Sequence, residues 1–423
     1  MRILWLSPNL LLPLDKGGKL RTWHLMRQLA HRHSITYVSF ADPAHTAQDR
    51  LDMAEVCSEL VTIPRREQPK AGPRFYAGVA RHLLDPVPYA VAQYRSEPYR
   101  RAVRDALART SFDRIVCDFL VPAINLPRRL PAPALLFTHN VEAEIWRRHA
   151  ETETNWLRRW LYRQQWARMR RFEGRLMARF DRVLAVSDVD RDTLQQLYAE
   201  SLTSPVSVIP TGVDTAYFAA GPRGSSGTPR IVFTGSMDWL PNVDAVMFFS
   251  REILPLIRQS EPTVTFTIVG RSPTAAVQRL AHEPGIDVTG RVDDVRPYLA
   301  ASTVNVVPLR IGGGTRLKIY EAMAAGRAVV STTVGAEGLP TEHGRHLLLA
   351  DDAATFARSV VSLLRDAEAR QAMESEARAL VMERYDWSAV AAHFDDALAD
   401  TRAATAPAVP SIPLTSPTRV KPL

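Results

Sequence analysis

The chain of 423 residues is long enough for two or three domains, and its 46% hydrophobic and 23% charged residues are ordinary for a globular protein. Two cysteines are too few for a disulfide framework, which argues against a disulfide-stapled secreted module. No run of 18 apolar residues occurs, so we predict no transmembrane helix; the formal net charge of +8 is compatible with anionic partners.

The N-terminal segment MRILWLSPNLLLPL has one basic residue, an early Ser-Pro-Asn break and no small-residue cleavage site, which favours a first β-strand over a signal peptide. Apolar, strand-like runs then alternate with helical patterns, as is typical of a doubly wound α/β sheet in each half. The runs predicted for the first domain are 3–6, 34–38, 115–116, 135–137 and 183–186. Those predicted for the second are 206–209, 231–233, 265–269, 286–288, 304–307, 328–330 and 346–349.

A break near Leu202–Pro205 predicts an N-terminal domain of residues 1–204 and a C-terminal domain of residues 205–385. An apolar-periodic helix follows at residues 386–400. Residues 401–423 contain five prolines together with Ser, Thr and Ala, a composition that predicts a disordered tail.

Residues 147–182 contain eleven arginines and only four acids, with tryptophans at 156, 160 and 166. Apolar side chains recur at helical spacing from Tyr162 to Phe180, which predicts one long helix. One interpretation is an amphipathic helix with its apolar stripe on the core and its arginines in water. The other is that Arg and Trp together contact an anionic membrane surface or a lipid-diphosphate acceptor.

The most informative segment, residues 304–339, predicts a strand, a turn of three glycines, a helix and a second strand. Glycines before a helix N-terminus leave backbone N–H groups free for a ligand. Arg316 and Lys318 lie in the first turn, where the helix dipole disfavours cations, so a bound diphosphate would account for them. Glu321, about one turn later, is placed to accept hydrogen bonds from a sugar hydroxyl.

This segment, GGGTRLKIYEAMAAGRAVVSTTVGAEGL, resembles the donor site of family-4 glycosyltransferases with the GT-B fold. Five further stretches follow the order of that family: 1–8 with 16–19, 137–142, 183–188, 208–214 and 231–242. The resemblance implies two facing Rossmann-like, doubly wound domains with a central cleft, and a last helix that crosses back onto the first domain. It also implies a retaining transfer of a hexose-type sugar from a nucleotide-diphosphate sugar, in which cationic side chains replace a metal.

The resemblance gives Glu321 the role of holding the donor ribose. The family often has a carboxylate beside the donor hexose at the position of Gly313, so that contact does not carry over to this chain. The sequence GGGTR before Glu321 resembles a sub-branch that makes bacterial cell-surface polysaccharide. Where many relatives have a phosphate-binding Arg, this chain has Ser236, which shifts that work onto Arg316 and Lys318.

The predicted site combines both halves. His139, at the end of a strand, occupies the place where the resembling enzymes have a His that faces the donor sugar. The resemblance therefore implies that it holds a sugar hydroxyl or the reacting centre and does not act as a free nucleophile. The catalytic positions are His139, Arg316, Lys318 and Glu321. The donor-binding positions are Gly17, Gly18, Gly235, Gly270, Arg271, Val292, Gly313, Gly314 and Thr315. No Asp-x-Asp cluster with a metal-site context occurs, so neither a metal nor a cofactor is expected.

These features predict a retaining glycosyltransferase of bacterial exopolysaccharide synthesis, with a glycan or polyprenyl-diphosphate-linked acceptor. We expect it in the cytoplasm, peripheral on the inner face of the plasma membrane. One alternative is a nucleotide-sugar epimerase of the same architecture, which would need acid and base groups around C2. Another is a basic nucleic-acid-binding protein, but the aromatics of the Arg-rich stretch are periodic and form no stacking platform. No nucleic-acid partner is therefore expected.

Overall fold

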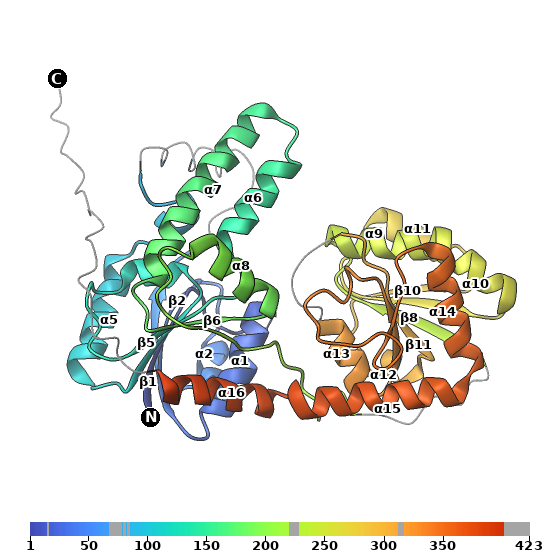
Figure 1. Cartoon of the computed structure of the whole chain (residues 1–423). Coiled ribbons are helices and arrows are strands. Elements are labelled where there is room, and N and C mark those ends of the chain that lie inside the picture. Colours follow the sequence, from blue (N-terminus) through green and yellow to red (C-terminus); the bar gives the residue numbers. More distant parts are fainter. Residues whose placement is uncertain are drawn as a thin grey trace.

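The computed structural model describes residues 1–14, 17–66, 78, 82, 85–219, 228–311 and 317–401. The chain forms two α/β domains, each built on a parallel sheet, which lie side by side (Figure 1). The tail predicted at 401–423 lies outside the described residues from residue 402 onwards. The doubly wound architecture predicted from alternating strands and helices is confirmed.

The first sheet has seven parallel strands in the order β3-β2-β1-β4-β5-β6-β7. Its strands are β1 (Arg2–Ser7), β2 (Ser34–Ala41), β3 (Glu59–Pro64), β4 (Arg114–Asp118), β5 (Ala134–Phe137), β6 (Arg182–Ala185) and β7 (Val206–Val208). Strand β3 was not predicted. It lies at the edge of the sheet, where Ile63 is its one buried residue, so it lacks the continuous apolar run of a central strand.

Strand β7 corrects the predicted division of the chain. The run 206–209 was assigned to the second domain, but β7 pairs with β6 and completes the first sheet. The first sheet therefore extends past the boundary expected between residues 204 and 205.

The second sheet has six parallel strands in the order β10-β9-β8-β11-β12-β13. They are β8 (Arg230–Thr234), β9 (Thr265–Val269), β10 (Ile286–Gly290), β11 (Val304–Val307), β12 (Ala328–Ser331) and β13 (Leu348–Leu349). All six were predicted from their apolar runs, although β13 is shorter than expected. Central strands such as β11 and β12 are buried at every position, which produces the continuous apolar runs typical of parallel sheets.

Helices cover both faces of each sheet. In the first domain they are α1 (Gly17–Leu29), α2 (Ala47–Asp52), α4 (Tyr89–Ala92), α5 (Glu97–Arg109), α6 (Glu142–Thr152), α7 (Trp156–Met177) and α8 (Asp188–Tyr198), with 3₁₀ turns at Met53–Glu55 and Val121–Asn125. In the second they are α9 (Leu240–Phe248), α10 (Leu254–Ser260), α11 (Ala275–Leu280), α12 (Arg296–Ala301), α13 (Leu317–Ala324), α14 (Ala353–Arg365) and α15 (Ala367–Arg384), with a π-helical turn at Phe249–Ile253.

The Arg-rich stretch forms two helices instead of the single long helix predicted. Helices α6 and α7 make a hairpin that projects from the first domain (Figure 1). The break falls where the Asn155 side chain accepts hydrogen bonds from the backbone N–H groups of Leu157 and Arg158, both at 3.1 Å. Asn is a favoured N-cap because it satisfies donors at a helix start, so it begins a new helix here.

The last helix, α16 (Trp387–Asp400), returns to the first domain while α15 lies against the second (Figure 1). Phe394 stacks on Trp5 with ring centroids 5.4 Å apart, and both side chains are fully buried. At the crossing point, Tyr385 stacks on Tyr320 of α13 at 4.5 Å. The C-terminal segment therefore completes one domain's core and touches the other domain.

Candidate active site

The strand order reverses between β1 and β4 in the first sheet and between β8 and β11 in the second. Ligands of doubly wound sheets bind outside the carboxyl ends of the strands at such points. A cleft of about 1250 Å³ lies there and is lined from both domains. Gly17 and His139 contribute from the first domain, and Trp239, Pro241 and Leu317 from the second.

His139 follows β5 and is held by two charged side chains. Its Nδ1 lies 3.0 Å from Arg21 Nη1, and its Nε2 lies 2.6 Å from Asp118 Oδ1. Arginine only donates, so Nδ1 must accept and Nε2 must carry the proton given to Asp118. Burial lowers the pKa of His139 below its ordinary value, although Asp118 opposes the shift. In this conformation both ring nitrogens are hydrogen-bonded within the protein.

The ring of Phe119 covers His139. The two rings stack at 3.8 Å with an interplanar angle of 7°. Phe119 has a φ of 66°, a left-handed conformation that a bulky residue rarely adopts. A Cβ at Gly18 would lie 2.7 Å from Phe119 Cζ, so glycine is needed there for the ring to fit. Gly18 thus has a packing role that is separate from the donor-binding role expected of it.

Arg21 connects this cluster to the segment between the domains. Besides His139, it donates through Nη2 to the hydroxyl of Thr211. Asp118 is also bonded to Thr22, whose hydroxyl lies 2.9 Å from Oδ2. The cluster around His139 is therefore a rigid charged network that reaches from the cleft to the interdomain linker.

The loop after His139 is fixed by a side chain from α7. The Glu173 carboxylate accepts the backbone N–H groups of Glu142 and Ala143, at 2.9 and 3.0 Å, and the hydroxyl of Tyr198 at 2.6 Å. It therefore caps the N-terminus of α6. Burial, with further contributions from neighbouring carboxylates, raises the pKa of Glu142 to about 8 and that of Glu173 to about 7.

In the second domain, Lys318 lies near the start of α13 with its ammonium group fixed in place. Its Nζ donates to Asn242 Oδ1 at 2.9 Å and sits 3.9 Å from the centre of the Phe233 ring. A Cβ at Gly235 would lie 2.7 Å from Lys318 Nζ, so glycine leaves room for the cation at the end of β8. The arrangement presents a positioned positive charge at the switch point of the sheet.

Gly235, Gly270 and Gly290 end three adjacent strands and lie close to one another. Gly270 donates its N–H to the Gly290 carbonyl at 3.2 Å. A Cβ at Gly270 would collide with the carbonyl oxygen of Gly235. Glycine is therefore required at position 270 by the backbone of Gly235, whereas Gly290 has a φ of 68° that favours glycine and Gly235 leaves room for the side chains of Asn242 and Lys318.

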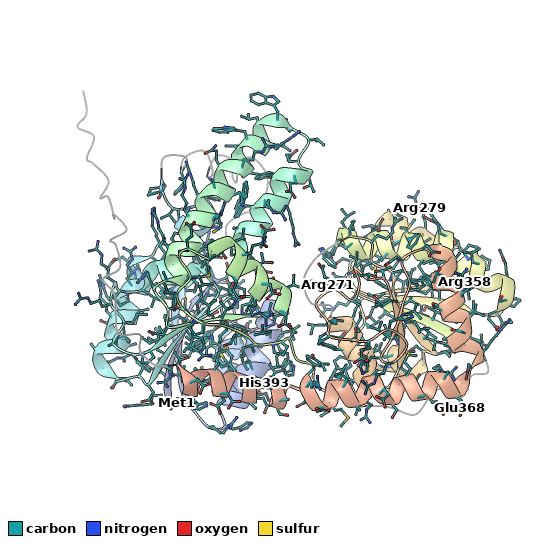
Figure 2. All side chains as sticks on the ribbon, viewed as in Figure 1. Met1, Arg271, Arg279, Arg358, Glu368 and His393 are labelled. Carbon is teal, nitrogen blue, oxygen red and sulfur yellow. The ribbon has the colours of Figure 1, made fainter. Side chains whose placement is uncertain are left out.

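Arg271 lies on the side of the second domain that faces the first, whereas Arg358 lies on the opposite side (Figure 2). The Nε of Arg271 donates to the Ser236 hydroxyl at 3.1 Å, and that hydroxyl lies 2.5 Å from Asp238 Oδ1. Val292 is half-buried just beyond β10, near the same strand ends. Ser236, which replaces the expected arginine, thus orients Arg271.

Glu321 lies on α13, one turn after Lys318, and is half-buried. Burial raises the pKa of its carboxyl from 4.5 to about 7, and Lys318 partly opposes that shift. Neither Glu321 nor Lys318 is among the residues that line the cleft, although their neighbour Leu317 is. The other predicted residues of this turn lie outside the described residues: Gly313, Gly314, Thr315 and Arg316.

Replacing Glu321 with glutamine is expected to stabilise the free protein increasingly as the pH rises from 4.5 to above 7. Because the folded-state pKa is raised, the stability linked to protonated Glu321 is fully present below pH 4.5 and is lost as the pH rises through about 7. For a half-buried group we expect a gain of about 2 kcal/mol for the variant at the upper end. Urea unfolding of both proteins across this pH range measures it.

The exposed Glu383→Gln variant on α15 serves as the control and should follow the parent at every pH. Parallel pH profiles for the parent and Glu321→Gln would show that the Glu321 carboxyl is not destabilised by its surroundings.

Two absences hold for the part of the chain that the structure describes. No group of three or more His, Cys, Asp or Glu side chains is arranged to hold a metal ion. Among the same residues, no helix has the length and apolar character needed to span a bilayer.

The site contains residues that the sequence did not single out, chiefly Asp118, Arg21 and Glu173. Asp118 ends the buried strand β4, and a carboxylate at that position is itself a signal of a site. Arg21 and Glu173 gave no such signal, because each looks like an ordinary helix charge until the fold brings it to His139 or to the start of α6.

Comparison with known proteins agrees with this architecture. Residues 16–217 match the model for Glycosyltransferase Family 4, and residues 228–366 match the model for Glycosyl transferases group 1. The chain belongs to the glycosyltransferases with a GT-B fold that combine these two domains.

Two curated relatives are a Klebsiella pneumoniae "uncharacterized 44.6 kDa protein in cps region" and a D-inositol 3-phosphate glycosyltransferase of Segniliparus rotundus. The first is 23% identical over 37% of this chain and 42% of the relative. The second is 27% identical over 55% of this chain and 54% of the relative. The chain thus matches about half the length of these relatives.

Among solved structures, Anabaena HepE in complex with UDP-glucose has a TM-score of 0.62 at 16% identity, covering 94% of this chain and 99% of HepE. At that identity the likeness establishes the fold.

Proposed function

We propose that this protein is a retaining glycosyltransferase that moves a sugar from a nucleotide-diphosphate sugar to a glycan or lipid-linked acceptor. The observation that carries the proposal is the position of Lys318, held by Asn242 and Phe233 at the switch point of the second sheet. A fixed cation at this point is suited to a donor diphosphate. The resemblance of HepE, solved with UDP-glucose, supports a nucleotide sugar as the donor.

In the proposed reaction, the acceptor hydroxyl attacks the anomeric carbon on the face from which the diphosphate leaves. The bond between that carbon and the diphosphate oxygen breaks, and a new bond to the acceptor oxygen forms. The acceptor proton passes to the leaving diphosphate, so the products are the glycoside and the nucleoside diphosphate. Lys318 would stabilise the charge growing on the diphosphate, and Glu321 would accept hydrogen bonds from the donor ribose.

The network of Arg21, His139 and Asp118 is assigned a positioning role, because both nitrogens of the His139 ring are bonded within the protein. It would hold the loop that faces the sugar. The likeness to a protein of a cps region supports a place in bacterial cell-surface glycan synthesis. The location that we propose for this synthesis is the cytoplasmic face of the plasma membrane.

Thermal unfolding in the presence of nucleoside diphosphates and nucleotide sugars tests the donor site. A ligand that binds only the folded protein raises the free energy of unfolding, by about 2.7 kcal/mol at 100 times its Kd. The unfolding temperature rises accordingly. Mass spectrometry and NMR of the products then distinguish transfer with retained configuration from epimerisation of the donor. A donor epimerised in the absence of acceptor would contradict the proposal.

Activity is expected to survive chelation, because a cationic side chain takes the place of a metal at the diphosphate. Transfer assayed with excess EDTA should match the untreated rate. Loss of activity with EDTA, restored by Mg²⁺ or Mn²⁺, would show instead that a metal neutralises the diphosphate.

A further inference from the structure

The α6–α7 hairpin exposes large apolar side chains at its outer end. Trp156 is 76% exposed, Leu157 49% and Trp160 46%. Trp156 and Trp160 are four residues apart in α7 and so lie on one face of the helix. The base of the hairpin is unlike this end, because Phe172, Leu176 and Met177 of α7 are buried.

Cationic side chains surround these aromatics. Arg158 and Arg163 are exposed in the first two turns of α7, and the helix carries seven arginines and one acid, the buried Glu173. The acids near the outer end are engaged locally. Glu151 pairs with Arg147 at 2.5 Å, and Glu153 accepts the N–H of Asn155 at 2.9 Å. The five residues Trp156, Leu157, Arg158, Trp160 and Arg163 are called the hairpin tip below.

Exposed tryptophan beside exposed arginine matches the chemistry of an anionic bilayer surface. Indole rings place an apolar body and a polar N–H at the boundary between acyl chains and headgroups. Arginine side chains are attracted by the negative potential at the surface of an anionic lipid layer. Contact with water costs free energy for the apolar side chains of Trp156, Leu157 and Trp160, and their burial in a headgroup layer removes that cost.

The cleft leads toward the hairpin tip. Its lining follows the inner side of α6 from Glu142 to Thr152 and includes Tyr162 of α7. Tyr162 packs against Trp146 and His149, with ring centroids 6.0 and 5.6 Å apart. The aromatic wall of the cleft, which includes Tyr162, therefore lies within about two helical turns of every residue of the hairpin tip.

We propose that the hairpin tip docks on an anionic lipid bilayer and places the outer end of the cleft at the headgroup layer. An acceptor carried by a membrane lipid would then enter the cleft along α6 without leaving the bilayer. The docking stands on the hairpin alone, whereas the entry of an acceptor rests on the proposed function. Both ends of the route lie in the first domain, so docking leaves the second domain free to bind donor.

Vesicle sedimentation tests the docking. The full chain should sediment with phosphatidylcholine vesicles that contain phosphatidylglycerol and should be released when NaCl is raised from about 0.1 M to about 0.5 M. Trp156→Ala combined with Trp160→Ala should weaken binding at least about tenfold. Brominated acyl chains should quench the fluorescence of the parent more than that of this variant.

A matched control removes exposed apolar side chains elsewhere. Leu51→Ala combined with Met382→Ala should bind vesicles as the parent does, since these residues are 67% and 47% exposed on other helices. Equal vesicle binding by the parent and the tryptophan variant would overturn the proposal. So would self-association of the parent without vesicles that the same variant abolishes, because the tip would then contact a second copy.

Failure of the docking is separable from failure of the proposed function. The tryptophan variant should keep the parent's thermal shift with nucleoside diphosphates, because its substitutions lie in the first domain far from Lys318. A parent that binds nucleotide but no vesicles would refute only the docking, and a parent that binds vesicles but no nucleotide would refute only the donor site.

Discussion

Turnover is expected to fall about 30- to 1000-fold when Lys318 is replaced by alanine, which corresponds to roughly 2–4 kcal/mol of transition-state stabilisation for one electrostatic contact. The Lys318 ammonium is already fixed by Asn242 at 2.9 Å and by the Phe233 ring at 3.9 Å. Little reorganisation is therefore needed when charge grows on the leaving diphosphate. Alanine removes the charge and leaves the strand end otherwise intact.

Steady-state kinetics with a saturating acceptor, together with the nucleotide thermal shift, measure this effect. Arg358→Ala is the control, since it removes a cation from the opposite side of the same domain (Figure 2). Circular dichroism establishes that both variants fold. Parent-like turnover in Lys318→Ala would remove the main support for the donor site.

Replacing Phe394 with alanine is expected to cost about 3–5 kcal/mol of unfolding free energy in the first domain, the scale for deleting a buried aromatic side chain. Phe394 is fully buried and contacts Trp5 at 5.4 Å and Phe137 at 5.5 Å between ring centroids. Both partners lie on central strands, so the cavity would open in the middle of the core and could not collapse easily.

Urea unfolding followed by circular dichroism measures the loss. The neighbouring His393 is exposed on the same helix (Figure 2), so His393→Ala should change stability by no more than about 0.5 kcal/mol. If Phe394→Ala were as stable as His393→Ala, α16 would not be part of the first domain's core.

The fold was largely predictable because its strands are buried on both faces. Ile3 and Trp5 pack on one side of the first sheet while Leu4 and Leu6 pack on the other, so the run is apolar at every position. The exceptions share a cause. Strand β3 lies at an edge of its sheet, and most of its positions are half-buried. Strand β7 is also only partly buried, and its sequence does not indicate which of the two sheets it joins.

The site was less predictable because its chemistry depends on distant pairs. Lys318 could be identified from its helix start, but its partner Asn242 is 76 residues away. Arg21 and His139 are 118 residues apart. Two of the predicted glycines also have packing roles that no local rule reveals: Gly270 makes room for a backbone carbonyl, and Gly18 makes room for the ring of Phe119.

The return of α16 to the first domain has a consequence for how the chain is made. The core that contains Trp5 needs Phe394 and Leu398, yet β7 ends at Val208. At about 5–20 residues per second, a ribosome takes about 10–40 s to synthesise the intervening stretch. During that time the second domain can fold completely, while one face of the N-terminal sheet is covered by α1 but still lacks the apolar side chains of α16. The part of the chain that is translated first is therefore finished last, and it is the part that a chaperone would have to shield.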